Sequence, residues 1–309
     1  MRRVPPVRED LDELGLSLAR ALRYVAAWGG QRVVLKFGGS AMDAGALGTL
    51  IEDVVELQAA GILPVLVHGG GPEISRRLEE EGLESRFIDG LRVTDERAMA
   101  IVEEVLAGSA NRRLVESIEA AGGRAAGVGG HRGLLAATPH PVRELGFVGM
   151  VSAVDPGPVE RLLERGVLPV IAPLASGPDG RPYNVNADAA AAALAGTLGA
   201  AKFMLLTDVP GVLSEGEDRP GERQLIAELT PSETEELIAR GVVSRGMIPK
   251  VRACLDAVAA GVPRAHILAA DRPHGVLVEL FTQEGVGTLI VDRTVSPTIV
   301  PGELQGVST

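Results

Sequence analysis

The stretch VVLKFGGS, residues 33–40, joins a short apolar run to a lysine and two glycines. Branched and aromatic residues bounded by glycine predict a buried strand that ends near Phe37. Glycines behind such a strand let the backbone approach a ligand closely, and a helix start presents free N–H groups to an anion. In a Walker-type phosphate loop the lysine follows the glycines, whereas Lys36 precedes them. The stretch therefore indicates an α/β fold with a phosphate site of another kind.

Runs of this kind recur along the chain and alternate with helical patterns. Strands are predicted at residues 33–37, 63–68, 167–173, 202–208 and 265–269. Helices are predicted at residues 46–60, 72–81, 95–107, 110–121, 186–198, 231–240 and 249–260. The alternation predicts a three-layer αβα sandwich, a largely parallel central sheet with helices on both faces. Turn-rich segments at 176–183 and 215–223 are expected to be exposed hairpins or loops, and a boundary between two lobes is expected near 176–186.

Composition limits the classes of function. The 309 residues are 46% hydrophobic and 3% aromatic, which is enough apolar material for a large core. A formal net charge of −11 argues against nucleic acid or an anionic membrane as the main partner. The single cysteine, Cys254, excludes a disulfide framework and fits a reducing cytoplasm. Neither a targeting segment nor a membrane-spanning run is recognisable, so a soluble cytoplasmic protein is expected.

A helix is predicted ahead of the first strand. Apolar residues recur at three- and four-residue spacings through residues 9–28, and Gly29 and Gly30 supply a stop signal. The apolar face comprises Leu11, Leu14, Leu18, Leu22, Val25 and Trp28. This face must pack either on its own domain or on another subunit, and the residues alone leave both possibilities open.

Two further turn motifs lie in the first half of the chain. HGGGPEI, residues 68–74, places three glycines between a strand and a helix whose first turn holds Pro72. Like the turn after Lys36, it either binds an anion or makes a tight connection only. DGLRVTDE, residues 89–96, contains Arg92, whose guanidinium either pairs with a surface acid or grips a ligand carboxylate with two hydrogen bonds.

Three motifs follow in the second half. YNVNADAAAAALAG, residues 183–196, alternates Asn184, Asn186 and Asp188, which could share one side of an extended segment. At least one of them is expected to cap the alanine-rich helix that follows. TDVPGVL, residues 207–213, ends a strand in a Pro-Gly turn, and SRGMIPKV, residues 244–251, places Lys250 near a helix start.

This inventory holds two lysines at element ends, one arginine, two glycine turns and an aspartate, without an obvious nucleophile–base pair. Attack of a substrate carboxylate on the terminal phosphate of ATP fits it. A carboxylate with a pKa of about 4 is ionised at neutral pH, so no general base is required. The site must instead align two anions and neutralise charge on the transferring group. Lys36 can do this by reaching over the glycine turn while the glycines hold the phosphate oxygens.

Together the motifs resemble those of the amino acid kinase family, in order and approximate spacing, from about Ala21 to Val291. With LGFVGMV, residues 145–151, they are most similar to the branch that phosphorylates N-acetyl-L-glutamate. The resemblance implies two lobes: residues 31–185 for the amino-acid substrate and residues 186–309 for the nucleotide. It also implies transfer of a phosphoryl group from ATP, with Mg²⁺, to the side-chain carboxylate of N-acetyl-L-glutamate in arginine biosynthesis.

The resemblance also implies roles for single residues. Lys36 and Lys250 match the lysines that stabilise the transferring phosphoryl group, and Asp188 matches the acid that positions them. Contacts to the acetylglutamate substrate fall on Gly70, Gly71, Arg92 and Asn184, the last two at its α-carboxylate. Phosphate and nucleotide contacts fall on Gly38, Gly39, Thr207 and Asp208. Mg²⁺ is expected on the phosphates, with no direct protein ligand.

The two ends of the chain resemble the arginine-inhibited branch of the family. In that branch N-terminal helices, here residues 1–30, interlace dimers into a hexamer, a trimer of dimers. Segment 265–290 resembles the effector segment, and L-arginine is the implied inhibitor. The positions that match arginine contacts are Tyr24, Lys202, His266, Glu279 and Gly285. The branch usually has Ile-Asp-Gly-Arg after the strand, where this chain has Leu268-Ala269-Ala270-Asp271, so the match is incomplete there.

Two other functions stay open. A kinase acting on the aminoadipate or glutamate end of a carrier protein in lysine biosynthesis shares the catalytic groups but needs an open, basic groove. A non-catalytic amino-acid sensor on the same fold would not need both lysines and Asp188. A nicotinamide-dependent dehydrogenase lacks support, because its glycine fingerprint and acidic partner are missing from the sequence.

Overall fold

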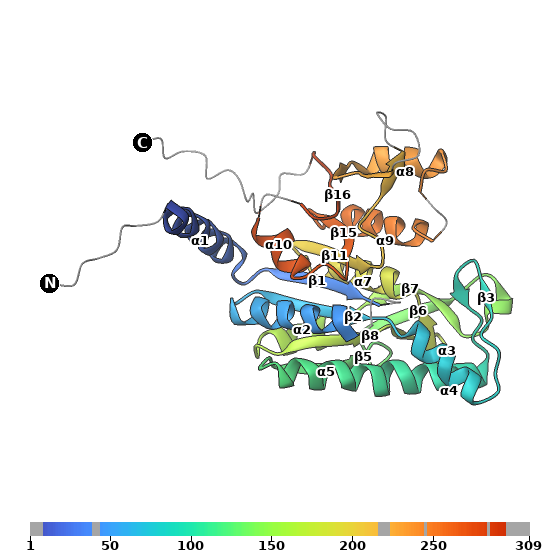
Figure 1. Cartoon of the computed structure of the whole chain (residues 1–309). Helices are drawn as coiled ribbons and strands as arrows, with labels where there is room; N and C mark the ends of the chain where they lie inside the picture. Colours follow the sequence, from blue (N-terminus) through green and yellow to red (C-terminus); the bar gives the residue numbers. More distant parts are fainter. Residues whose placement is uncertain (1–8, 39–43, 216–222, 244–245, 283–284, 295–309) are drawn as a thin grey trace.

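The computed structural model describes residues 9–38, 44–215, 223–243, 246–282 and 285–294. Its centre is an eight-stranded sheet with the order β14-β16-β15-β11-β1-β2-β8-β5 (Figure 1). The strands are β14 (Glu228–Leu229), β16 (Thr288–Ile290), β15 (Ala265–Ala269), β11 (Lys202–Thr207), β1 (Arg32–Phe37), β2 (Leu63–His68), β8 (Leu168–Ala172) and β5 (Ala125–Gly129). The run from β15 to β5 is parallel, whereas β16 pairs antiparallel with β15.

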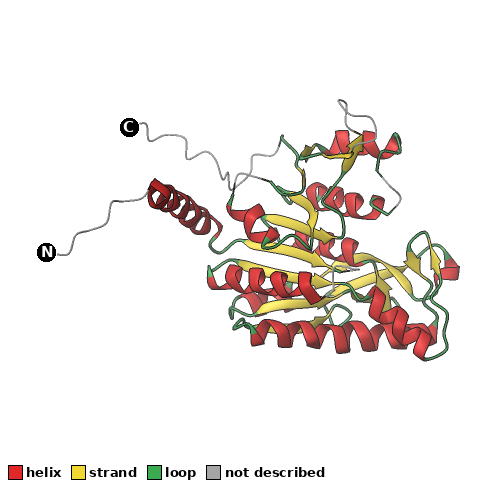
Figure 2. Cartoon of the chain, viewed as in Figure 1, coloured by secondary structure: helices red, strands yellow, loops and turns green. Residues whose placement is uncertain are grey.

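Helices cover both faces of this sheet (Figure 2). One face carries α2 (Ala44–Ala59), α5 (Asn111–Ala120) and α10 (Gly275–Phe281). The other carries α6 (Gly157–Leu163), α7 (Ala187–Thr197) and α9 (Ile248–Ala259). Side chains alternate between the faces along each strand. In β1, Leu35 packs in the α2 core and Val34 in the α7 core, so Lys36 falls on the α7 side.

Smaller elements complete the fold. The strands β10 (Pro182–Val185), β7 (Val148–Val154), β6 (Leu135–Pro139) and β9 (Leu174–Ser176) form a closed barrel. Two hairpins consist of β3 (Phe87–Ile88) with β4 (Leu91–Arg92), and β12 (Leu213–Glu215) with β13 (Arg223–Leu225). Further helices are α3 (Gly71–Glu80), α4 (Glu96–Glu103), α8 (Pro231–Ala239) and the 3₁₀ helix Arg143–Leu145. Between α4 and α5 the chain continues as the π-helix η2 (Glu104–Ala110).

The N-terminal helix α1 (Glu9–Trp28) projects away from the sheet (Figure 1). Its last residue, Trp28, is buried in the same core as α10. Leu18 and Leu22, by contrast, are 56% and 68% exposed. Packing on the same chain therefore accounts for the end of the predicted apolar face and not for its middle.

The predicted fold class is confirmed, and all five predicted strands occur with bounds within one residue. The predicted gap between helices 95–107 and 110–121 is wrong, because η2 joins α4 to α5 without a break. The short helices α6 and α10 were not predicted. β11 pairs directly with β1, so one sheet runs through both predicted lobes. In the described ranges, no helix has both the length and the apolar character that crossing a membrane requires.

Candidate active site

Lys36 lies at the carboxyl end of β1 and points into the layer of α7 and α9. Its Nζ is 2.7 Å from Oδ1 of Asp188, in the first turn of α7. The other oxygen of Asp188 accepts a hydrogen bond of 3.2 Å from Nζ of Lys250, in the first turn of α9. One carboxylate thus holds two ammonium groups that come from a strand and from a second helix.

Asn186 is the residue that caps α7. Its side-chain oxygen accepts hydrogen bonds from the backbone N–H groups of Asp188 and Ala189, at 2.9 and 3.1 Å. This cap leaves the Asp188 carboxylate free to meet the lysines. The predicted extended segment is therefore wrong for Asp188, which is already helical, whereas Asn184 does lie in a strand, β10.

Burial and attraction compete in this cluster of Lys36, Asp188 and Lys250. Burial lowers the pKa of Lys36 below the ordinary lysine value, although Asp188 acts to raise it. Burial alone would raise the pKa of Asp188, but the two ammonium groups hold it below its ordinary value. Asp188 is therefore ionised at neutral pH, and with both lysines protonated the cluster has a net charge of +1, which favours an anionic ligand.

The two glycine turns touch beside this cluster. A Cβ on Gly38 would lie 2.9 Å from Cα of Gly69, and a Cβ on Gly70 would lie 2.7 Å from Cδ2 of Leu106. The N–H of Gly69 donates to the carbonyl of Phe37 at 2.8 Å, which ties the second turn to the end of β1. Glycine is required at Gly38 because a side chain there would collide with the backbone of Gly69, whereas at Gly70 a side chain would displace the end of the Leu106 side chain.

Lys36, Asp188 and Lys250 line one wall of a cavity of about 270 Å³. The other walls include all the predicted substrate contacts, which are Gly70, Gly71, Arg92 and Asn184. Residues from five separate sequence motifs therefore meet at one cavity, as a shared site requires. We call it the acceptor cavity.

Arg92, in β4, lines the acceptor cavity, and hydrogen bonds to other residues of the chain fix its guanidinium group. Its Nη1 donates to Oγ of Ser85 at 2.6 Å, and its Nη2 donates to the carbonyl of Gly71 at 2.9 Å and to Oγ of Ser75 at 2.8 Å. The guanidinium also lies 4.7 Å from the centre of the Phe87 ring. Burial lowers its pKa, and its protein acceptors in the described part of the chain are all neutral. A buried cation with neutral partners favours an anionic ligand.

Asn184 is tied to Arg92 through Thr94. Its Nδ2 donates to Oγ1 of Thr94 at 3.3 Å, and this hydroxyl donates to the carbonyl of Arg92 at 2.8 Å. Thr94 and the two serines behind Arg92 were not predicted from the sequence. Ser75 follows Gly71 by one helical turn, which could have indicated a shared face, but no local signal marks Ser85.

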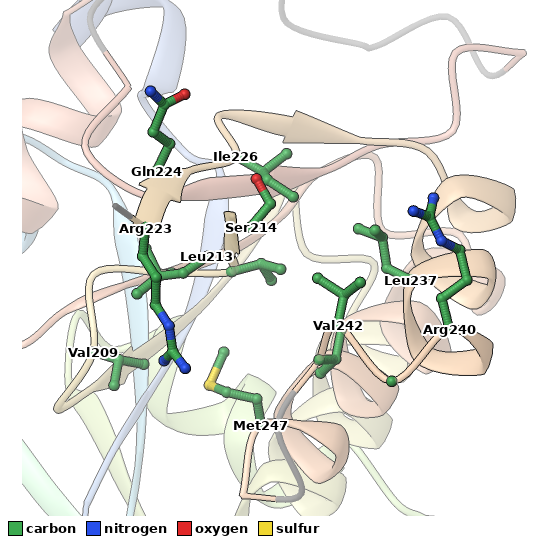
Figure 3. A pocket seen from close by; sticks show the side chains of 14 residues that line it. Val209, Leu213, Ser214, Arg223, Gln224, Ile226, Leu237, Arg240, Val242 and Met247 are labelled. Carbon is green, nitrogen blue, oxygen red and sulfur yellow. The ribbon is translucent and has the colours of Figure 1, made fainter. Parts of the chain in front are cut away.

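A second cavity, of about 860 Å³, has both apolar and polar groups in its lining, and eight apolar side chains contribute to it (Figure 3). They belong to Val209, Val212, Leu213, Ile226, Leu237, Val242, Val243 and Met247. Arg223 and Arg240 add positive charge to its lining, and Figure 3 shows the Arg223 guanidinium turned toward Met247. Met247 lines this cavity and Lys250 lines the acceptor cavity, so the start of α9 connects the two.

Thr207 and Asp208, the predicted nucleotide residues, precede the second cavity without lining it. Thr207 Oγ1 donates to Oδ1 of Asp208 at 2.9 Å, and Val209 is the first lining residue of this turn. Arg223 and Arg240 were not predicted, because neither belongs to a motif with a recognisable spacing. Among the described residues, no group of three His, Cys, Asp or Glu side chains could hold a metal ion.

Lys202, His266 and Glu279 form a separate buried cluster on the α10 side of the sheet. Oε1 of Glu279 is 3.0 Å from Nζ of Lys202 and 2.8 Å from Nδ1 of His266. Burial would raise the pKa of Glu279, but His266 and Lys202 hold it well below its ordinary value. Burial, followed by the Lys202 charge, lowers the pKa of His266 to about 4. Beside Gly285, the N–H of Val286 donates to Oε2 of Glu279 at 3.1 Å.

Two predicted positions cannot be placed beside these groups. Gly39 lies outside the described residues, and Tyr24 is described only as part of the backbone of α1. The structure thus brings the catalytic and substrate predictions together at one cavity, and four of the five effector predictions (Lys202, His266, Glu279 and Gly285) together at another place.

Comparison with known proteins gives these clusters a context. A protein-family model for the amino acid kinase family matches residues 31–269, a range that holds every predicted catalytic and substrate residue. The chain belongs to the amino acid kinase family.

Relatives within the amino acid kinase family extend over most of the chain. The acetylglutamate kinase of Syntrophomonas wolfei is 44% identical over 280 residues, which cover 89% of this chain and 96% of that protein. The acetylglutamate kinase of Acaryochloris marina is 46% identical over 275 residues, covering 88% and 96%. The N-acetylglutamate synthase of Neisseria gonorrhoeae, solved with coenzyme A and N-acetyl-glutamate, has a TM-score of 0.79 at 24% identity. The match covers 90% of this chain and 63% of the synthase, and shows the shared fold.

Proposed function

We propose that this chain transfers the terminal phosphoryl group of ATP to the side-chain carboxylate of N-acetyl-L-glutamate, which gives N-acetyl-L-glutamyl 5-phosphate, the second step of arginine biosynthesis. The observation that carries the proposal is the Lys36–Asp188–Lys250 cluster, which faces the acceptor cavity and borders a larger cavity through α9. Relatives named acetylglutamate kinase, at 44% and 46% identity over nearly nine tenths of the chain, support the choice of acceptor.

The acceptor carboxylate is the nucleophile in this proposal. It is ionised at neutral pH, so one of its oxygens attacks the terminal phosphorus without a general base, and ADP leaves with the bond electrons. The cluster's two ammonium groups lie where negative charge on the transferring group can be neutralised. Each oxygen of Asp188 faces one of the two ammonium groups, so its proposed role is to hold both lysines in place.

Arg92 and Asn184 orient the acceptor before chemistry. The guanidinium, held from behind by Ser75 and Ser85, receives the α-carboxylate of acetylglutamate, and the Asn184 amide lies across the same cavity. Two anions must be brought together in line, and separate cationic sites for the α-carboxylate and the phosphoryl group reduce their mutual repulsion.

The larger cavity is the proposed site of ATP, with apolar walls for the purine and arginines at the rim. Mg²⁺ would be bound by the phosphates of ATP and would neutralise part of their charge. Among the described residues, no cluster of carboxylates could hold the ion directly. We also propose the division into residues 31–185 for acceptor binding and 186–309 for nucleotide binding, within one continuous sheet. L-arginine is proposed as an effector at the cluster of Lys202, His266 and Glu279.

A coupled assay of ADP release tests the acceptor. With ATP and Mg²⁺, acetylglutamate should support turnover at least about tenfold faster than glutamate or aminoadipate. Preference for aminoadipate, or for a glutamate-carrying protein, would replace the proposed function by the lysine-biosynthesis alternative. If none of these acceptors increases ADP release, the result would favour the other alternative, an amino-acid sensor that binds ligands and hydrolyses ATP only slowly.

A further inference from the structure

His68 and Asn111 form a buried polar pair behind the HGGG turn, and phosphoryl transfer as proposed makes no use of it. His68 is the last residue of β2 and is fully buried, and Asn111 is the first residue of α5 and is 5% exposed. In β2, Leu66 packs in the core that contains α5 residues, so alternation places His68 on that side too, away from the Lys36 side. Burying polar groups is costly unless they are hydrogen-bonded, so the partners of this pair define its role.

Two backbone carbonyls fix the direction of the hydrogen bonds. Nδ2 of Asn111 is 2.8 Å from the carbonyl of Val170, which can only accept, so this atom is the amide nitrogen. The same nitrogen is 3.1 Å from Nε2 of His68, which must therefore be the unprotonated ring nitrogen. Nδ1 of His68 is 2.8 Å from the carbonyl of Gly69 and carries the proton. The chain of donors runs from Asn111 through His68 to Gly69.

The imidazole in this chain is a neutral donor. Burial lowers the pKa of His68 to about 4, so it stays uncharged at neutral pH. The surroundings are shaped to keep Asn111 in place, because a Cβ on Gly127 would collide with Oδ1 of Asn111. The π-helix η2 ends directly before Asn111, and π-helical segments within α-helices are frequent at functional sites.

The hydrogen bond from His68 to the Gly69 carbonyl also fixes the direction of the Gly70 N–H, because the peptide bond between Gly69 and Gly70 is planar. The carbonyl of Gly69 and the N–H of Gly70 belong to one trans peptide and point in opposite directions. Gly70 lines the acceptor cavity, and in the described part of the chain its N–H donates to no protein acceptor. Three consecutive glycines would otherwise allow this peptide to rotate, because glycine has the widest choice of backbone angles.

We propose that His68, oriented by Asn111, is a positioning residue for phosphoryl transfer: it fixes the Gly69–Gly70 peptide so that the N–H of Gly70 points into the acceptor cavity. This inference rests on the proposed function. It assigns His68 no contact with substrate and no proton transfer. The Gly70 N–H then donates to negative charge at the reacting centre, in a direction set before substrate binds.

Two substitutions of similar size separate this role from simple packing. In His68→Asn the amide nitrogen reaches the Nδ1 position and can still donate to Gly69, whereas in His68→Gln it reaches the Nε2 position and cannot. We expect His68→Gln to lower kcat about ten- to a hundredfold, the scale of a misdirected donor, with the KM for ATP nearly unchanged. His68→Asn should keep kcat within about threefold of the parent, and both melting temperatures should fall alike.

Equal kcat in the two variants, whether both normal or both reduced, overturns the positioning role. Failure of the proposed function is recognised separately, because the unmodified enzyme would then form no product from acetylglutamate. A second measurement does not depend on activity. Long-range ¹⁵N–¹H spectra of histidine-labelled protein should show His68 protonated at Nδ1, with its signal assigned through whichever variant folds. A proton on Nε2 overturns the proposal.

Discussion

Lysine is rare in this chain and is found only at Lys36, Lys202 and Lys250, among 30 basic residues. Each of the three meets a carboxylate, either Asp188 or Glu279. The other basic residues are arginines, whose pKa is too high to shift into the working range. All three lysines of this chain therefore place a compact positive charge beside a buried carboxylate. Burial lowers the pKa of Lys36 and Lys202.

The lowered pKa of Lys36 predicts an alkaline limit on activity. The ammonium loses its proton as pH rises through a value below that of an ordinary lysine, about 10.4. The ratio kcat/KM, which reports the free enzyme, should therefore fall on the alkaline side before an ordinary lysine titrates. Lysine-labelled NMR spectra can follow this titration directly, because the chain has only three lysines. A Lys36 signal that titrates at or above the ordinary value contradicts the prediction.

Loss of either ammonium group to which we assign a role in phosphoryl transfer should affect chemistry more than binding. Lys36→Met and Lys250→Met keep most of the side-chain volume, and each removes one of the two positive charges that face the Asp188 carboxylate. Each should lower kcat by roughly two orders of magnitude or more, the scale of one lost electrostatic stabiliser. Steady-state kinetics with melting curves as the folding control measure this. Near-normal kcat in Lys36→Met would remove the basis for its proposed role.

Arg92 should act on binding of the acceptor. Arg92→Lys keeps a positive charge but cannot hold Ser75, Ser85 and a carboxylate at once. The KM for acetylglutamate should rise about tenfold or more, while the KM for ATP hardly moves. Arg97→Lys, at an exposed position of α4, is the matched control and should change neither. Equal rises in both KM values for Arg92→Lys would indicate a nucleotide role instead.

At the scale of elements, α10 is held to α2 by a charged contact. Oδ1 of Asp53 lies 2.7 Å from Nδ1 of His274, and Oδ2 of Asp53 accepts from the N–H of Val276 at the start of α10. Hydrogen bonding to Asp53 raises the pKa of His274. A histidine whose pKa is raised in the folded protein stabilises the fold at pH values below its ordinary pKa of about 6.5. This contribution is lost as the pH rises through the raised pKa of the folded state.

His274→Gln should therefore lower stability more at about pH 6 than at about pH 9, where the histidine is neutral in both states. Urea unfolding at the two pH values measures the difference between the parent and the variant. The comparison repeated in an Asp53→Asn background should lose most of its pH dependence, because the partner charge is gone. A destabilisation that grows with pH would contradict the role given to the charged histidine.

The elements also show what the sequence could and could not predict. Long buried strands and their glycine turns were recognised because their local patterns are strong, and with them came Lys36 and Gly70. Asp188 and Lys250 were placed from motifs, but their convergence on Lys36 depends on the pairing of β1 with β11 and on the packing of α7 against α9. Short elements such as α6 and α10, and contacts such as His68 with Asn111, depend on long-range packing that no local pattern encodes.

At the scale of the whole molecule, α1 presents Leu18 and Leu22 of its predicted apolar face largely to solvent. We propose that they pack on α1 of another copy and interlace dimers into a hexamer. Leu18→Asp combined with Leu22→Asp should then reduce the particle mass to that of a dimer while kcat is kept, because Trp28 and the site remain intact. Light scattering measures both proteins. An unmodified chain that is already dimeric at micromolar concentration contradicts this assembly.

The Lys36–Asp188–Lys250 cluster is central to the proposed transfer of a phosphoryl group to a carboxylate. Hydroxylamine trapping tests this role most directly, because an acyl phosphate reacts with hydroxylamine to give a hydroxamate and phosphate. With ATP, Mg²⁺ and N-acetyl-L-glutamate, we expect one hydroxamate for each ADP formed, and a loss of both in Lys36→Met. ADP without hydroxamate, or hydroxamate formed at the parent rate by Lys36→Met, would contradict it.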